Sequence, residues 1–110
     1  MSESIYNFPT RTSGLVWPGI AEFRIKINGA NPPVSLESVK IQFRKGPLGS
    51  IKLELNSENG TVIIKNSISW IFSIPPIKIS LWPRVYSYTI VTTDSNGKSS
   101  TYIKGEWLIV

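Results

Sequence analysis

Apolar and polar residues alternate with a period of two along most of the chain, which is the pattern of β-strands whose successive side chains point to opposite faces. The clearest run is Ala21–Ile27, in which an alanine, a phenylalanine and two isoleucines alternate with charged residues. Val39–Arg44 and Ile51–Asn56 repeat the pattern, and the loop Lys45–Ser50 between them has the glycines and proline of a hairpin connection. These runs predict one half-buried strand followed by an antiparallel pair.

Two further pairs of strands are predicted along the chain. Thr61–Lys65 precedes Ser67–Ile74, which a Pro-Pro pair ends. The apolar residues of the second run would share one side of its strand: Ile68, Trp70, Phe72 and Ile74. Tyr86–Thr93 and Thr101–Val110 predict a final hairpin around the loop Asp94–Lys98.

Turn signals separate these runs. Asn-Gly dipeptides at 28–29, 59–60 and 96–97 supply residues that accept the positive φ of tight turns. No window of eleven residues has a helical period, and the single short helical turn that we expect is Ile77–Leu81, before Trp82-Pro83. The sequence therefore predicts an all-β protein of about seven short strands. We expect two packed antiparallel sheets, because a single open sheet would leave one apolar face in water.

The first nineteen residues differ from the rest, because their aromatic residues and prolines show no clean alternation. We interpret 1–19 as an N-terminal arm and 20–110 as the β-sandwich domain. Two placements of the arm fit the sequence: along an edge of its own domain, or docked on a neighbouring subunit. For the second placement the candidate protein-interface residues are Ile5, Tyr6, Phe8, Pro9, Leu15, Val16 and Trp17.

Composition narrows the available chemistry. The 110 residues include no cysteine and no histidine, which excludes disulfides, the usual zinc and haem ligand sets, and catalysis by imidazole or thiolate. Of the seven carboxylates, we expect Glu22 and Glu54 to pair with cations across strands, and Glu58 and Asp94 to stabilise turns. We therefore expect no metal, no other cofactor and no enzymatic activity.

The charge balance leaves two binding alternatives open. The net charge is +5, and several basic residues flank the Gly-x-x-Gly segment Gly46–Gly49: Lys40, Arg44, Lys45 and Lys52. A phosphate-clamping loop of this kind joins two helices in the KH domain, whereas strand patterns flank it here, so we expect a turn. Exposed aromatics could stack on bases, but Phe23, Phe43, Trp70 and Phe72 fall on apolar faces. Sugar binding on an exposed tryptophan is the other alternative, with Trp17, Trp82 or Trp107 as the platform.

From these residues we expect neither a secretory signal nor a membrane-spanning segment. The apolar stretches Val62–Ile64 and Leu108–Val110 are far shorter than the ~18 residues that a spanning helix needs. We expect synthesis in the cytoplasm and no membrane partner.

The segment Ser80–Ile90 is more distinctive, because Leu-Trp-Pro leads into a Tyr-x-Tyr strand. Asp94–Gly97 and Ile103–Val110 follow it. This order of motifs resembles small bacteriophage and prophage structural proteins, including the N-terminal domain of the baseplate upper protein group. Upstream, Val39–Arg44, Gly49–Leu55 and the turn Asn59-Gly60 are also similar to that family. The likeness covers most of the sandwich domain, from Leu36 to the last residue.

The resemblance implies an immunoglobulin-like antiparallel β-sandwich. In such a fold the hydroxyl of Tyr86 or Tyr88 would bond to a neighbouring backbone group, as a tyrosine corner does. The implied function is that of a virion protein of the tail, baseplate or fibre-attachment region, with head decoration as an alternative. It would be made in the host cytoplasm and act by contacts with other virion proteins and with copies of itself, as a symmetric homo-oligomer.

Overall fold

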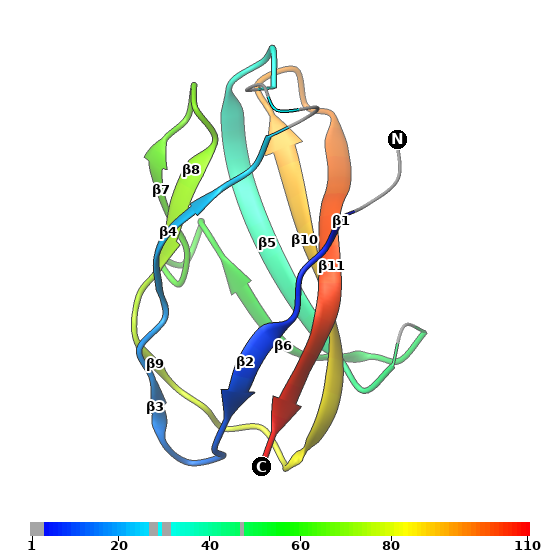
Figure 1. Ribbon diagram of the computed structural model, residues 1–110. Helices are drawn as coiled ribbons and strands as arrows, with labels where there is room; N and C mark the ends of the chain where they lie inside the picture. The colour runs from blue at the N-terminus through cyan, green and yellow to red at the C-terminus, as the bar shows by residue number, and fades with distance from the viewer. Residues whose placement is uncertain (1–3, 27–28, 30–31, 47) are drawn as a thin grey trace.

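The computed structural model of the protein describes residues 4–26, 29, 32–46 and 48–110, and these residues form strands and no helix (Figure 1). The largest sheet has the order β1-β11-β10-β5-β6, and β2 also pairs with β11. A second sheet has the order β4-β8-β7, and β3 pairs with β9. The strands are β1 (Ser4–Ile5), β2 (Phe8–Arg11), β3 (Val16–Trp17), β4 (Ile20–Arg24), β5 (Leu36–Arg44), β6 (Ile51–Asn56), β7 (Ile63–Asn66), β8 (Ile71–Ile74), β9 (Ile77–Lys78), β10 (Arg84–Asp94) and β11 (Ser99–Ile109).

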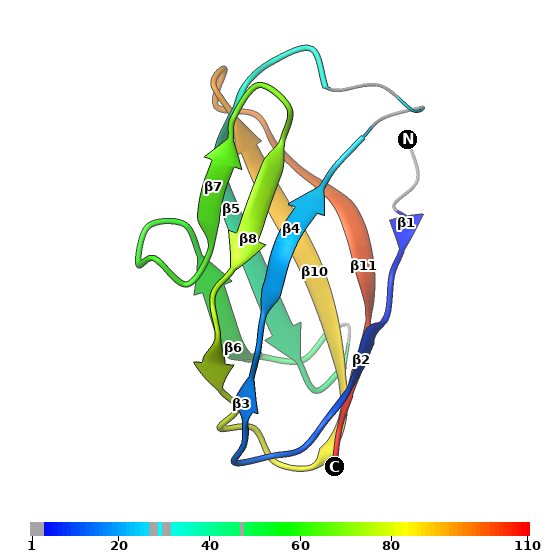
Figure 2. The same ribbon diagram turned by 60° about the vertical axis from the view of Figure 1, so that its left-hand side comes forward.

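The prediction of an all-β fold with two packed layers is confirmed. The β4-β8-β7 sheet faces the large sheet, in an open, sandwich-like arrangement with the core between them (Figure 2). Aromatic side chains from both ends of the sequence meet in that core: Phe8, Phe43, Tyr88 and Trp107 form five ring pairs with centroids 4.3–6.2 Å apart. Burial of these large rings is a major source of stability for a domain without disulfides.

Both predicted hairpins of the large sheet are present. β5 and β6 are antiparallel, with Phe43 opposite Leu53, and β10 is antiparallel to β11. The glycines of the three Asn-Gly dipeptides have positive φ, from 79° to 81°, as the turn chemistry predicted. Asn28 lies outside the described residues.

The predicted strand over 21–27 is shorter and less regular than its alternation indicates. The register of β4 against β8 shifts between Ile20 and Phe23, and Ala21 is exposed where the alternation predicted it to be buried. β4 ends at Arg24, while Ile25 is buried and donates its N–H to the Trp70 carbonyl at 3.1 Å. An irregularity of this kind turns side chains to the other face of a sheet, and Ile27 lies outside the described residues.

In the predicted strand over 67–74, only the second half is extended, and the first half is a turn. Residues 67–70 connect β7 to β8, and Ile68, predicted to share the apolar face, is 70% exposed. The Asn66 side chain accepts the backbone N–H of Ile68 and of Ser69, both at 3.0 Å, which is a turn that asparagine favours. Trp70 still reaches the core, through a left-handed backbone with φ 55°.

The helical turn predicted at 77–81 is wrong. Ile77 and Lys78 form β9, which pairs antiparallel with β3, and the Ile79 N–H donates to the Leu15 carbonyl at 3.0 Å. This pairing with a segment about 60 residues upstream stabilises extended backbone. The short strands β1, β2 and β3 in 4–17, together with β9, explain why the structure has more strands than the seven expected.

The N-terminal arm lies along the large sheet of its own chain. β1 pairs parallel with β11, where Ser4 is opposite Ile103, and β2 continues along the same strand, where Phe8 is opposite Trp107. The Trp107 Nε1–H donates to the Pro9 carbonyl at 2.9 Å. Residues 4–11 therefore extend the sheet of the domain.

Gly105 makes the close approach of the arm to β11 possible. A Cβ at this position would lie 1.9 Å from the Tyr6 carbonyl oxygen and 2.9 Å from Cε1 of Tyr88. The Tyr88 hydroxyl donates a hydrogen bond to that same Tyr6 carbonyl. Burial, followed by the electrostatic interaction with the ionisable hydroxyl of Tyr6, raises the pKa of Tyr88 well above its ordinary value.

Candidate functional site: an apolar end beside a basic hollow

Several large apolar side chains are exposed near the end of the sandwich where β10 begins and β11 ends, drawn at the bottom of Figure 1. We call this group the apolar end; it consists of Leu15, Val16, Trp82, Val85, Leu108 and Val110, exposed by 41–83%. Val85 and Leu108 are directly opposite across β10 and β11. The Val110 carbonyl accepts the N–H of Ser13 at 2.9 Å, which brings the β2–β3 loop to the same end. Exposed large apolar side chains that gather at one end of a domain are candidates for an interaction surface.

Trp82 is the most exposed residue of the apolar end, and two hydrogen bonds define the backbone around it. The Ser13 hydroxyl donates to the Leu81 carbonyl at 2.6 Å, and the Tyr86 hydroxyl donates to the Trp82 carbonyl at 2.8 Å. Leu81 and Tyr86 are buried, whereas Trp82 is 83% exposed. The indole is therefore presented to solvent from an anchored segment.

The bond predicted from the hydroxyl of Tyr86 or Tyr88 to a backbone group is present, and both tyrosines form one. Tyr86 bonds to a backbone carbonyl four residues upstream, and Tyr88 bonds to the carbonyl of Tyr6. The first bond has the local character of a tyrosine corner. The second ties the arm to β10.

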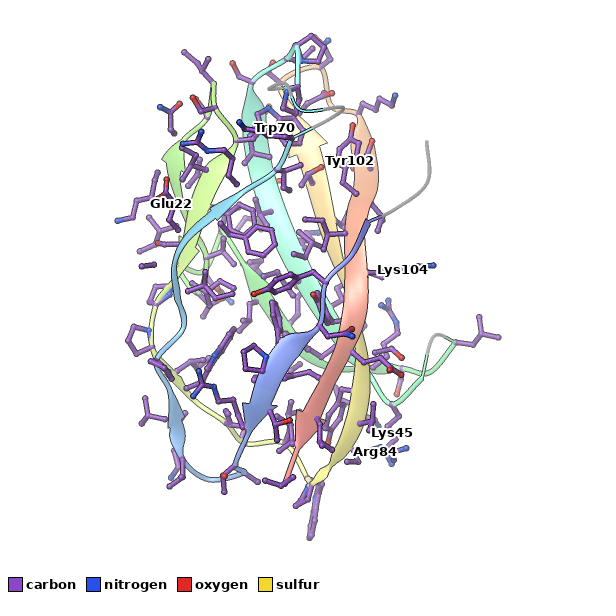
Figure 3. The ribbon with its side chains drawn as sticks, in the orientation of Figure 1. Glu22, Lys45, Trp70, Arg84, Tyr102 and Lys104 are labelled. Atoms are coloured by element: carbon purple, nitrogen blue, oxygen red, sulfur yellow. The ribbon has the colours of Figure 1, made fainter. Side chains whose placement is uncertain are left out.

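A hollow of about 440 Å³ opens beside Trp82, and we call it the basic hollow. Its lining residues are Lys45, Lys52, Ser80, Leu81, Trp82, Pro83, Arg84 and Tyr86. Three of these side chains are cationic and none is anionic. Lys45 and Arg84, labelled in Figure 3, lie at the same end of the molecule.

The sheet register explains why the basic hollow exists. β5 ends at Arg44, which is opposite Ser87 of β10. β10 begins three residues earlier, at Arg84, so its first residues extend beyond the end of β5. Lys45, which directly follows β5, and Lys52, the second residue of β6, line the opening.

The carboxylates predicted to pair across strands have other partners. Glu54 accepts hydrogen bonds from Gln42 Nε2 and Asn56 Nδ2, both at 3.0 Å. The Gln42 bond first, then the Asn56 bond and the charges of Lys40 and Arg44, lower the pKa of Glu54. Glu22 lies 3.6 Å from Arg24 of its own strand. These carboxylates therefore stabilise the outer sheet surfaces locally.

The turn role predicted for Asp94 is confirmed. Its carboxylate accepts the backbone N–H groups of Asn96 at 2.9 Å and Lys98 at 3.0 Å. Glu58 lies in the β6–β7 connection, where it lines another surface hollow. Within the described ranges, no group of three or more acidic residues is placed to hold a metal ion.

The candidate interface residues of the arm divide into two groups. Phe8 and Trp17 are buried in the core of their own chain, 4% and 1% exposed. Tyr6, Pro9, Leu15 and Val16 are exposed. The backbone of Ile5 pairs with Lys104 in β11; its side chain lies outside what the structure describes. The exposed members Leu15 and Val16 belong to the apolar end.

The aromatic candidates for ligand stacking are mostly in the core. Phe43, Trp70 and Phe72 are buried and Phe23 is half-buried, as their apolar faces predicted. Trp17 and Trp107 are also buried, so of the three proposed sugar platforms Trp82 alone is exposed. The glycines of the Gly-x-x-Gly segment lie between β5 and β6, and the Gly49 N–H donates to the Gly46 carbonyl at 3.0 Å, as in the expected turn; residue 47 lies outside the described residues.

A second hollow, of about 380 Å³, lies on the outer face of β10 and β11. It combines Arg44 and Lys104 with the carboxylate of Glu106, and small residues of β10, Ser87 and Thr89, form part of its floor. Its charges are mixed, in contrast with the basic hollow.

Comparison of the chain with protein-family models, with curated proteins and with solved structures returns no match in any of the three. Over the part of the chain that the structure covers, no helix has the length and apolar character to cross a membrane.

Proposed function

We propose that the chain is a structural protein of a bacteriophage virion, in the tail, baseplate or fibre-attachment region, with head decoration as the alternative position. It acts without catalysis, by contacts with other virion proteins and with copies of itself in a symmetric homo-oligomer. The motif order of Ser80–Ile90, Asp94–Gly97 and Ile103–Val110 is the basis for the virion assignment.

We further propose that the sandwich is immunoglobulin-like. The order β11-β10-β5-β6 corresponds to strands G, F, C and C′ of that fold, and β4-β8-β7 corresponds to B, E and D. The bond from the Tyr86 hydroxyl to the Trp82 carbonyl, near the start of the F-like strand, gives independent support.

The observation that carries the contact function is the apolar end. Trp82 is 83% exposed on an anchored backbone, and five other large apolar residues at that end are also exposed. Exposed aromatic anchors with apolar neighbours are characteristic of protein interfaces, where tryptophan is enriched among the residues that dominate affinity. The apolar end is therefore the surface that we assign to assembly.

Particles purified from a lysate in which the gene is expressed test this proposal. We expect quantitative mass spectrometry to find the chain at a fixed ratio to the other particle proteins. A Trp82→Ser variant should fold with an unchanged melting temperature and be lost from particles. The matched control is Ile68→Ser, because Ile68 is also exposed but lies at the β7–β8 turn at the opposite end (Figure 1). Absence of the wild-type chain from particles, or equal incorporation of Trp82→Ser, would contradict the proposal.

The exposure of Trp82 favours one second candidate function, carbohydrate binding, because an indole face can stack on a sugar ring. This candidate predicts binding to a glycan array that Trp82→Ser abolishes and that high salt leaves unchanged. Nucleic-acid binding has less support, since Trp82 is the one strongly exposed aromatic ring next to the basic hollow.

A further inference from the structure

We propose that the basic hollow binds an acidic segment of a partner protein, whose carboxylates pair with Lys45, Lys52 and Arg84 while an apolar residue of the same segment packs on Trp82. This inference rests on the proposed function and specifies the chemistry of the partner at that surface. It is argued from the charge of the hollow, its shape and its continuity with the apolar end.

The charge of the hollow favours an anionic occupant. Lys45 directly follows β5, Lys52 is the second residue of β6 and Arg84 is the first residue of β10, and all three line the same opening. None of the three forms an ion pair with a residue that the structure describes. Three converging cations repel one another, and an anion between them removes that repulsion and gains attraction.

The shape of the hollow fits a short segment of chain. The opening of about 440 Å³ is lined by Lys45 and Lys52 from the β5–β6 region and by residues 80–84 before and at the start of β10. Its lining also includes the buried residues Leu81 and Tyr86 and the polar residue Ser80. A few side chains with apolar stems and charged ends would contact both kinds of lining.

Continuity with the apolar end distinguishes an acidic protein segment from a nucleic acid. Trp82 belongs to both surfaces, and Val85 follows Arg84 directly along β10. A phosphate backbone would neutralise the cations but would leave Val85 and Leu108 in water. A protein partner can cover both, with apolar contacts at the centre and ion pairs at the rim.

Lys78 adds to the positive character of this end. A neighbouring hollow on the other side of residues 80–83 is lined by Lys78 together with Ser13, Gly14 and Trp82, and no carboxylate side chain lines it. An acidic segment that crosses Trp82 would therefore meet cationic side chains on both sides.

Fluorescence of Trp82 provides the test. The other tryptophans, Trp17, Trp70 and Trp107, are 0–2% exposed, so acrylamide quenches mainly the Trp82 indole. The probe is an eight-residue synthetic peptide of six glutamates and two leucines, and its control replaces every glutamate with glutamine. We expect the glutamate peptide to protect Trp82 from quenching at about 50 mM salt, and to lose this effect at about 500 mM salt because exposed charges are then screened.

Charge variants identify the site. Lys45→Gln, Lys52→Gln and Arg84→Gln combined should weaken binding about tenfold, as expected from three exposed ion pairs. The matched control neutralises three exposed lysines outside the hollow, Lys26, Lys65 and Lys98, and should leave binding unchanged. Equal protection by the glutamate and glutamine peptides, or an equal effect of the two triple variants, would overturn the inference.

Competition experiments distinguish an acidic protein segment from a nucleic acid or a glycan as the occupant of the hollow. If an eight-nucleotide poly-dT or a sulfated oligosaccharide displaces the peptide at lower concentration than unlabelled peptide does, the hollow is a nucleic-acid or glycan site and the inference is wrong. Incorporation of variants into particles distinguishes failure of this inference from failure of the proposed function. Loss of the Lys45/Lys52/Arg84 variant from particles supports the inference. Normal incorporation of that variant beside exclusion of Trp82→Ser overturns the inference and leaves the proposed function standing.

Discussion

The ring of Phe8 decides how far the N-terminal segment contributes to stability. It is 4% exposed and stacks on Tyr88, with centroids 4.3 Å apart and an interplanar angle of 6°. It is also edge-on to Trp107 at 5.8 Å and 5.5 Å from the Trp17 ring. Phe8→Ala removes these contacts and leaves a cavity among rings from four other strands, β3, β5, β10 and β11.

Substitutions of this kind cost about 3–5 kcal/mol when the site cannot collapse. The aromatic neighbours of Phe8 are large and rigid, so we expect a value in that range. A domain of this size has a total stability of about 5–15 kcal/mol. Phe8→Ala therefore removes a large share of the free energy of unfolding, although Phe8 lies only a few residues from the N-terminus.

Equilibrium unfolding in urea, followed by tryptophan fluorescence and by near-ultraviolet circular dichroism, measures the effect. The matched control is Thr10→Ala, because Thr10 is an exposed residue of the same strand and surface substitutions stay within about 0.5 kcal/mol. A loss below about 1 kcal/mol for Phe8→Ala would refute the reasoning, since the ring would then contribute no more than a surface residue.

Three further outcomes are expected. Gly105→Ala forces the Tyr6 backbone away from β11 and should lower stability by about 1–3 kcal/mol, seen as faster hydrogen exchange at Tyr6; unchanged exchange would contradict this. Because the pKa of Tyr88 is raised on folding, the stability of the wild type should fall above about pH 10 more steeply than that of Tyr88→Phe. Urea unfolding at several pH values measures this, and equal pH dependence of the two proteins would contradict it. The hydrogen bond from Gln42 lowers the pKa of Glu54, so the stability that ionised Glu54 contributes to the folded state should be present above about pH 4.3 and lost at lower pH. The difference in stability between wild type and Glu54→Gln should therefore shrink on acidification. A difference that stays constant with pH would argue against the Gln42 bond.

Local alternation predicted the elements whose partners are close in sequence. β5 and β6 are joined by a short loop, and so are β10 and β11, so turn residues and apolar period together determine their pairing. Alternation failed where a backbone irregularity or a side-chain hydrogen bond decided the structure. The register shift after Ile20 exposes Ala21, and the Asn66 side chain turns the chain before Trp70.

The arm could not be placed from its own sequence, because the partner of Phe8 is Trp107, about 100 residues away. The same limit applies to the basic hollow. Lys45 and Lys52 could be noted as basic residues around a loop and Trp82 as one of three exposed-tryptophan candidates. Arg84 was missed, because its place beside them follows from the register of β10 on β5. The sequence feature that could have pointed to Arg84 is Leu-Trp-Pro-Arg at 81–84, in which the arginine follows the exposed tryptophan closely.

The parallel pairing of β1 and β2 with β11 has a consequence for biosynthesis. A ribosome adds about 5–20 residues per second, so residues 4–11 wait several seconds for residues 99–109, their partner strand, to be made. During that time Phe8 has no ring to pack against from β10 or β11. Closing contacts between such distant segments is slow, because the chain entropy is lost before the contact energy is gained. The nascent chain therefore carries Phe8 without its partner strand until β11 emerges, and synthesis of β11 is the step that ends this susceptibility to aggregation.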